Sequence, residues 1–340
     1  GIPSGSAPEG IIEGLIKTPE GNIALVHQAD LEGPGGHILY LLDSSLRPVK
    51  SLVQSDLDSE SNYEIKPYGQ GFVAYSSDYG QVYKYSSINA ASSKMALTAP
   101  KNNKLKALSL YVSGNHITIG YSDPQSDPMK ASSNEILDYS DSRSTDTAFS
   151  GLPIVAASFC GQASLCVRSA DKSMSVYNSG GKLLSKLWGI EEMQPMGGQI
   201  LLALDDKTVL FNVDENTGLP EYTYGSYKFC GLQPIAADAY LLCMKSGNKT
   251  VALEIHRSSD DQDSIDKKIN QLQKLPQVDT VSIYRNYIYI VPQSASLKYD
   301  AAHKITEPDP AAQAAINLKI NKEIDTLGIN RNAYKIIITG

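Results

Sequence analysis

Four cysteines offer the clearest chemistry in this chain, because they fall into two closely spaced pairs. Cys160 and Cys166 flank one short turn, and Cys230 and Cys243 flank another. In a hairpin centred on each turn the two cysteines would be directly opposed, about 4.5 Å apart at Cα, which permits a disulfide. We therefore expect Cys160–Cys166 and Cys230–Cys243 disulfides and an oxidising compartment. The alternative is four buried thiols that pack as small hydrophobic side chains.

The histidines and the remaining motifs give no local catalytic pattern. None of the five histidines has HxxxH or HExxH spacing, and the cysteines have no CxxC spacing. His27, His116 and His256 fall at the ends of predicted strands, where a lone histidine more often packs or forms a hydrogen bond than binds a metal. No GxSxG, P-loop or GxGxxG motif is present. We therefore expect no cofactor and a non-enzymatic role, although a site assembled from separate repeats would leave no local motif.

Acidic loops are the remaining candidates for ligand binding. Residues 56–60, 123–127 and 260–263 each collect carboxylates. Calcium takes about six to eight oxygen ligands, which such loops could supply, but none follows the EF-hand pattern. Calcium in these loops is therefore an alternative to ordinary solvent-exposed turns.

The elements that must position these residues follow a strand–turn–strand pattern that recurs about every forty residues up to about residue 250. Residues 21–27 are followed by 37–43, and residues 199–204 by 208–213. A fixed period of short strands is typical of a β-propeller, in which each repeat forms one small sheet. We predict a mainly β fold with a six-bladed β-propeller over residues 11–258, and a seven-bladed ring as the alternative. The predicted first strands of the six sheets are 11–17, 63–67, 105–112, 154–159, 192–195 and 227–232.

Polar turns after the third strand of a repeat, such as 178–181 and 214–218, resemble those of the quinoprotein-like and WD-repeat groups of propellers. The Trp-Asp and Gly-His signatures are absent, and Trp188 is the single tryptophan. The resemblance covers about 240 residues and implies an architecture without functional residues.

The repeat ends after His256, and the pattern changes to helices. Residues 264–275 carry apolar side chains at helical spacing with Asp263 as N-cap, and a second helix is predicted at 309–327. With strands near 278–284, 287–291 and 334–339, this order predicts a small α/β module over residues 259–340. The module would be ferredoxin-like if residues 251–255 supply its first strand. In the alternative, residues 278–306 form a seventh blade, and residues 1–10 are expected to be a flexible leader in either case.

The segment from Asp123 to Ser150 is predicted to be a long polar insertion that interrupts the third sheet, which is expected to resume with a strand at 135–139. Insertions within repeats often lie on the binding face, and the alternative is a loop with no partner. The candidate partner-binding residues are Asp123, Asp127, Asp141 and Arg143. Separately, Asn248 begins an Asn-Lys-Thr sequon and is a candidate glycosylation site.

The amino-acid composition limits the classes of partner that the chain is expected to bind. The net charge of −7 and the scarcity of arginine argue against nucleic acid, and no apolar run is long enough to span a membrane. Twenty tyrosines suit contacts with a protein or glycan. We therefore expect a secreted, periplasmic or cell-surface interaction scaffold, adhesin, or envelope or filament assembly subunit, as a component of a larger assembly. The alternative is a secreted propeller enzyme that acts on carbohydrate.

Overall fold

The computed structural model describes most of the chain up to residue 273 and short strands beyond it. The described residues are 11–28, 36–42, 48–123, 132–140, 143–149, 154–161, 163–196, 198–246, 249–273, 278–284, 287–292, 298–299, 305–306 and 335–338. The chain divides into two compact units. Unit 1 contains Gly1–Lys17, Gly21–Glu60 and Tyr224–Gly340, and unit 2 contains Thr18–Glu20 and Ser61–Thr223.

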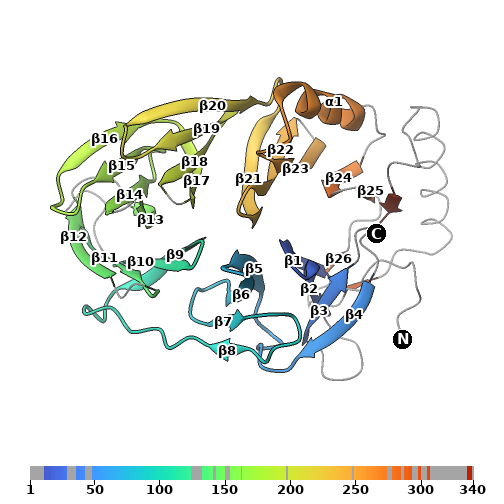
Figure 1. Ribbon diagram of the computed structural model, residues 1–340, viewed down its shortest axis with the longest axis horizontal. Coiled ribbons are helices and arrows are strands. Elements are labelled where there is room, and N and C mark those ends of the chain that lie inside the picture. The colour runs from blue at the N-terminus through green and yellow to red at the C-terminus, as the bar shows by residue number, and fades with distance from the viewer. Residues whose placement is uncertain are drawn as a thin grey trace. The chain divides into compact units, whose positions relative to one another are not determined.

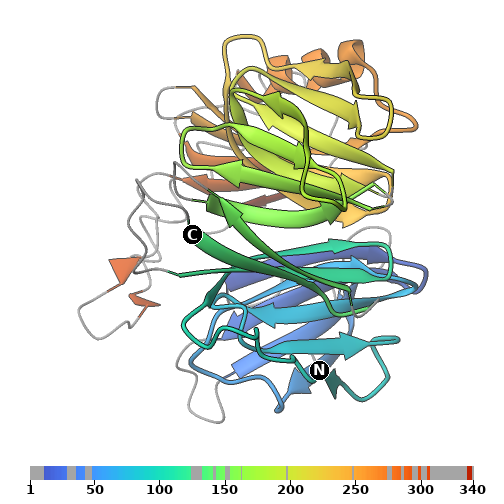
Figure 2. The same ribbon diagram turned by 90° about the vertical axis from the view of Figure 1, so that its left-hand side faces the viewer.

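Unit 2 consists of four consecutive antiparallel sheets of four strands each (Figures 1 and 2). In every sheet the strands are neighbours in the order in which the chain visits them. The sheets are β5 (Tyr63–Tyr68), β6 (Gly71–Ser76), β7 (Val82–Tyr85) and β8 (Ser93–Lys94); β9 (Lys106–Ser113), β10 (His116–Ser122), β11 (Ser132–Asp138) and β12 (Arg143–Phe149); β13 (Ile154–Cys160), β14 (Ser164–Ser169), β15 (Met174–Tyr177) and β16 (Leu183–Leu187); and β17 (Ile190–Met196), β18 (Gln199–Leu204), β19 (Lys207–Asn212) and β20 (Thr217–Thr223).

Apolar clusters hold neighbouring sheets of unit 2 face to face. Val73 and Ile119 belong to the cluster between the first two sheets, Ile136 and Val167 to the next, and Met174 to the cluster that reaches the fourth sheet. The first strands β9, β13 and β17 contact one another, and β5 contacts β9. Four-stranded meanders that pack face to face and bring their first strands together are the blades of a β-propeller. The predicted architecture is therefore confirmed for this part of the chain.

Unit 1 contains one four-stranded sheet and one six-stranded sheet among its described residues. The first comprises β1 (Ile11–Thr18), β2 (Gly21–Gln28), β3 (Gly36–Leu42) and β4 (Pro48–Gln54). The second comprises β21 (Lys228–Ala236), β22 (Ala239–Ser246), β23 (Lys249–His256), β24 (Val278–Tyr284), β25 (Tyr287–Pro292) and β28 (Lys335–Ile338). Helix α1 (Gln262–Gln273) connects β23 to β24, and β26 (Lys298–Tyr299) pairs with β27 (Ile305–Thr306).

The C-terminal strands differ from the predicted module. Strands β23 and β24 are adjacent and parallel, β24 and β25 are antiparallel, and β28 is parallel to β25. A ferredoxin-like fold is built on split βαβ units, in which another strand separates the two parallel strands. The order of the described strands therefore contradicts the ferredoxin-like prediction, and β24, β25 and β28 continue the sheet that contains β21–β23. The number of blades and the boundary at residues 258/259 stay predictions.

Helix α1 begins two residues earlier than predicted, and its cap is Asp261 instead of Asp263. Asp261 Oδ1 accepts a hydrogen bond from the Ser264 amide (2.8 Å), and Ser264 Oγ accepts one from the Asp261 amide (3.1 Å). This reciprocal pairing satisfies two amides that the helix itself leaves without partners. Ile265 and Ile269 are buried, as their spacing predicts. The predicted helix at 309–327 and the leader at 1–10 lie outside the described residues.

The predicted loop at 123–150 is wrong for half of its length, because 14 of its 28 residues form β11 and β12, and β11 covers most of the strand expected at 135–139. These strands pair antiparallel over their whole length, from Ser132 opposite Phe149 to Asp138 opposite Arg143. The Ser/Thr/Asp-rich sequence of β12 indicates a loop, but the strand pairs with β11 at the end of its sheet, where its backbone hydrogen bonds are formed with a single neighbour.

Candidate functional site

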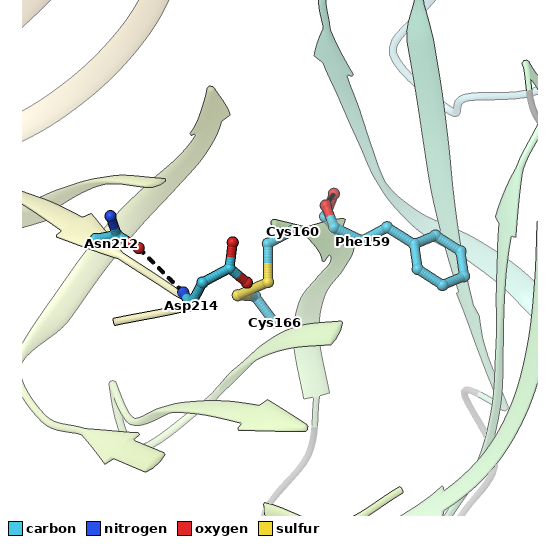
Figure 3. The surroundings of a disulfide bond; sticks show 6 residues. Phe159, Cys160, Cys166, Asn212 and Asp214 are labelled. Atoms are coloured by element: carbon cyan, nitrogen blue, oxygen red, sulfur yellow. Dashed lines mark hydrogen bonds between the residues drawn. A yellow bond between two sulfur atoms is a disulfide. The ribbon is translucent and has the colours of Figure 1, made fainter. Parts of the chain in front are cut away.

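The structure contains the Cys160–Cys166 disulfide, but the two residues are diagonal neighbours instead of directly opposed (Figure 3). In the ladder, Cys160 lies opposite Ser164, and Ser158 lies opposite Cys166. The turn is thus centred one residue earlier than predicted. The Cα atoms are 5.9 Å apart, which is near the most common separation for disulfides. The bond therefore closes the β13–β14 hairpin.

The disulfide hairpin packs against a turn of the next sheet. Gly161 has a φ of 61°, and a Cβ atom there would lie 3.2 Å from Asp214 Oδ1. Asn212 Oδ1 accepts a hydrogen bond from the Asp214 amide at 3.1 Å (Figure 3) and another from the Glu215 amide at 3.1 Å, which fixes that turn. Glycine meets both demands, left-handed backbone and close approach. The polar turn after β19 therefore has a packing role in this structure.

The other predicted site residues are not brought together in the described part of the chain. Cys243 lies opposite Gly231, and Cys230 falls in the bulge beside it. The side chain of Cys243 lies outside the described residues, so the second disulfide stays a prediction. Asp123 follows β10 and Arg143 begins β12. Asp127, Asp141 and Asn248 lie outside the described residues, and their roles stay predictions.

Two of the acidic loops have local structural roles. Asp58 Oδ1 accepts a hydrogen bond from the Glu60 amide (3.2 Å). Asp260 Oδ2 accepts one from the His256 amide (2.8 Å), next to the cap formed by Asp261. These contacts are typical of turns and helix caps.

A cluster of charged residues and tyrosines gathers around the first strands of unit 2, and we call it the central cluster. Its members come from five strands, β5, β6, β9, β14 and β17, which belong to four sheets. The strands β5 and β17 both contact β9. The members are Glu64, Lys66, Tyr75, Tyr111, Arg168 and Glu192.

Hydrogen bonds and ion pairs connect the central cluster across sheets. The Tyr75 hydroxyl donates to Glu64 within one sheet, and the Tyr111 hydroxyl donates to Glu192 Oε1 in another sheet at 2.9 Å. Arg168 Nη2 lies 3.6 Å from Glu192 Oε2. Lys66 Nζ lies 5.4 Å from the ring centroid of Tyr75 and 5.9 Å from that of Tyr111, within range of a cation–π interaction.

Burial sets the protonation states in this cluster. Burial, reinforced by the Glu64 carboxylate, raises the pKa of Tyr75 well above its usual value, and burial with the Glu192 charge does the same for Tyr111. Burial lowers the pKa of Lys66, which the two carboxylates partly oppose. The tyrosines therefore stay neutral hydrogen-bond donors at physiological pH.

The central cluster balances its own charges. Two cations stand beside two carboxylates, and each carboxylate already accepts a tyrosine hydroxyl. Such an arrangement ties the sheets together. The sequence analysis did not predict the central cluster. One indication was present: Glu64 and Lys66 are two residues apart in a predicted first strand, so their side chains lie on the same face of the sheet.

The outer strand β16 exposes apolar side chains, and we call Leu183, Leu184, Lys186 and Trp188 the edge surface. Leu183 is 48% exposed, Leu184 46% and Trp188 61%. Among the described strands, β16 pairs with β15 alone, through a register shift next to Tyr177. Lys186 Nζ lies 4.7 Å from the Trp188 ring centroid. Sequence reasoning noted Trp188 only as the single tryptophan.

The sheets of unit 2 define a β-propeller protein, and comparison with known proteins adds no narrower class. No protein-family model matches the sequence, and no curated protein does. Among solved structures, the chain is similar to the Dos1 propeller (14% identity, TM-score 0.41, covering 71% of this chain and 67% of that one). It is also similar to the WD40 β-propeller domain of Doa1 (10% identity, TM-score 0.41, covering 69% and 76%).

A third match is HIRA(644–1017), at 14% identity and a TM-score of 0.29, which covers 46% of this chain. The chain spans 54% of the length of that HIRA chain. These TM-scores carry no functional argument, and the fold class follows from the sheet order and packing. No helix within the described residues is long and apolar enough to cross a membrane.

Proposed function

We propose that this chain is an extracytoplasmic interaction scaffold, exposed at a cell surface, in a periplasm or in secreted form, and that the edge surface contacts its protein partner. The observation that carries the proposal is Trp188, a tryptophan 61% exposed beside an outer strand. Tryptophan is among the residues that contribute most binding energy at protein interfaces. An adhesin or an envelope or filament assembly subunit would use such a surface.

The edge surface combines two features of protein recognition. Outer strands present backbone amides and carbonyls that another chain can pair with, and Leu183 and Leu184 offer apolar area beside them. Lys182 and Lys186 lie on or beside the same strand, which discourages indiscriminate strand pairing between copies. A partner with an apolar and acidic segment suits this combination.

The Cys160–Cys166 disulfide supports the extracytoplasmic part of the proposal. Disulfides persist in oxidising compartments and are rare in the cytosol of most organisms. The segment near Asp123 and Asp127, between β10 and β11, is a second proposed contact surface. Half of the insertion predicted at 123–150 forms strands β11 and β12, so this segment is less distinct from the other repeats than predicted. The edge surface is therefore tested first.

Affinity capture from the native source tests the proposal. The full chain is compared with a Leu184→Lys, Trp188→Lys variant and with Leu219→Lys, a control at a leucine 69% exposed on the outer strand β20. We expect wild type and control to retain the same partner. The double variant should retain at least about tenfold less, because loss of a central aromatic contact typically exceeds about 1.4 kcal/mol. Equal capture by all three proteins would contradict the role of the edge surface.

A further inference from the structure

Two histidines and a glutamate meet in unit 1, on the three strands β1, β2 and β3. His27 and His37 are direct cross-strand partners, and their rings stack with centroids 4.3 Å apart. Glu13 Oε1 lies 2.6 Å from His37 Nδ1 and 3.7 Å from His27 Nδ1. One carboxylate oxygen and two ring nitrogens therefore lie within 4.8 Å of one another.

Two backbone carbonyls fix the hydrogen on each imidazole. His27 Nε2 lies 2.8 Å from the Ser59 carbonyl oxygen, and His37 Nε2 lies 3.0 Å from the Asp58 carbonyl oxygen. A carbonyl oxygen only accepts hydrogen bonds, so each Nε2 must carry the hydrogen. The Nδ1 atom of each ring is then the one that faces Glu13, and it offers a lone pair to a metal ion once the ion displaces any proton there.

We propose that Glu13, His27 and His37 bind a divalent transition metal of the zinc type. Two imidazole nitrogens and one carboxylate oxygen are a ligand set that Zn²⁺ and neighbouring first-row ions accept. Ligating histidines usually donate their other N–H to a carboxylate, carbonyl or water, and here two consecutive carbonyls of one loop take that role. Three protein ligands leave one position of a tetrahedral ion open, which suits a bridging side chain from a partner or a water.

Burial fixes His37 and Glu13 in this site, whereas His27 is more accessible. The side chain of His37 is fully buried, that of Glu13 is 6% exposed and that of His27 is 14% exposed. The stacked rings are only 19° from parallel, so the His27 ring must rotate before both lone pairs point at one ion. The partly exposed position of His27 permits that rotation. The Glu13 carboxylate offsets part of the ion's charge inside the sheet.

Metal titration of the full chain tests this proposal. After treatment with a chelator, calorimetry with Zn²⁺ should show one ion bound per chain, and Co²⁺ should give the visible absorption of a tetrahedral site. His27→Phe keeps an aromatic ring for stacking, and Glu13→Gln keeps the shape of the glutamate. Each variant should weaken binding at least about tenfold, because even supporting residues of metal sites contribute that much.

His116→Phe is the matched control. His116 Nδ1 lies 3.3 Å from Asp138 Oδ2, yet this pair belongs to no three-ligand group among the described residues. The control should bind Zn²⁺ like the wild type, and melting curves of all three variants establish that each is folded. Absence of saturable binding in the wild type would overturn the proposal. Equal binding by the wild type, His27→Phe and Glu13→Gln would overturn it as well.

Discussion

The two polar clusters of the chain balance charge in opposite ways. In the central cluster of unit 2, Arg168 stands beside Glu192, and each carboxylate also accepts a tyrosine hydroxyl. In unit 1, two imidazole nitrogens converge on Glu13, and backbone carbonyls hold the far side of each ring. In the first cluster, the charged groups of the chain pair with one another. In the second, two imidazole nitrogens and a carboxylate oxygen lie close enough together to bind one cation, as proposed above.

Comparing the two clusters shows how a polar network that stabilises the fold can be distinguished from a ligand-binding site by mutation. A network that satisfies its own charges contributes to the free energy of unfolding, so its removal should destabilise the fold. A group of convergent lone pairs contributes to binding, so its removal should change ligand affinity more than stability. The following variants test this distinction.

Glu192→Leu should have the largest effect on stability. It removes the acceptor of the Tyr111 hydroxyl and the ion-pair partner of Arg168, both of which are largely buried. We expect a loss of about 3 kcal/mol in urea unfolding, the cost of leaving a charge and a hydroxyl unsatisfied. Glu191→Gln is the control, because its partner Lys172 is 58% exposed. The control should cost less than about 1 kcal/mol, and equal losses would contradict a structural central cluster.

The loss of stability on removing the disulfide can be compared with the loss on removing the central cluster. Cys160→Ala with Cys166→Ala opens a short loop, and loop entropy predicts a loss of about 2 kcal/mol in the free energy of unfolding. Peptide mapping of the wild type under non-reducing conditions should find Cys160–Cys166 and Cys230–Cys243. Four free thiols in protein from the native source would contradict the extracytoplasmic proposal.

The central cluster should also give the chain a characteristic response to alkaline pH. The folded-state pKa values of Tyr75 and Tyr111 are raised above the ordinary 10.0, so their stabilisation is complete below about pH 10 and is lost as pH rises further. The folded-state pKa of Lys66 is lowered, so its contribution has the opposite sign and stability rises with pH up to about 10.4.

Urea unfolding between about pH 8 and pH 11.5 measures this profile. Tyr111→Phe should make the loss above pH 10 shallower and cost about 1 kcal/mol at neutral pH, the value of one hydrogen bond. A wild-type profile that stays flat or keeps rising above pH 10 would show that these tyrosines are not held neutral by the fold.

His27→Phe should have a small effect on the metal-free protein. Its ring is partly exposed and phenylalanine can still stack on His37, so we expect a change below about 1 kcal/mol. With Zn²⁺ at about one hundred times its Kd, wild type should gain about 2.7 kcal/mol and the variant far less. A loss in the metal-free variant as large as that of Glu192→Leu would place this cluster with the structural networks.

Strands with alternating apolar residues between glycine turns could be predicted from the sequence. The expected strands 21–27 and 37–43 correspond to β2 and β3, and 154–159 corresponds to β13. Strand β12 could not be predicted, because its polar residues are held by a ladder to β11 that local sequence does not reveal. The turn between Cys160 and Cys166 was predicted to within one residue. Because of that one-residue difference, the two cysteines are diagonal neighbours and not directly opposed as predicted.

The two clusters were predictable to different degrees. Pairing the expected strands around their loop already places His27 opposite His37, so two of the three residues of that site could be paired from the sequence. The position of Glu13 depends on the register of β1 and the rotamers of both rings. The central cluster depends on how four sheets pack, and nothing in the spacing of Tyr111 and Glu192 indicates that they meet.

Site-specific photocrosslinking through the edge surface tests the central claim most directly. A photoreactive phenylalanine derivative replaces Trp188 in the full chain, expressed in its native source, and the same residue at Leu219 serves as the control. The scaffold account predicts one discrete crosslinked protein from position 188, in an oxidising compartment, and none of that product from position 219. Identical products from both positions, or no product from position 188, would contradict partner binding by the edge surface.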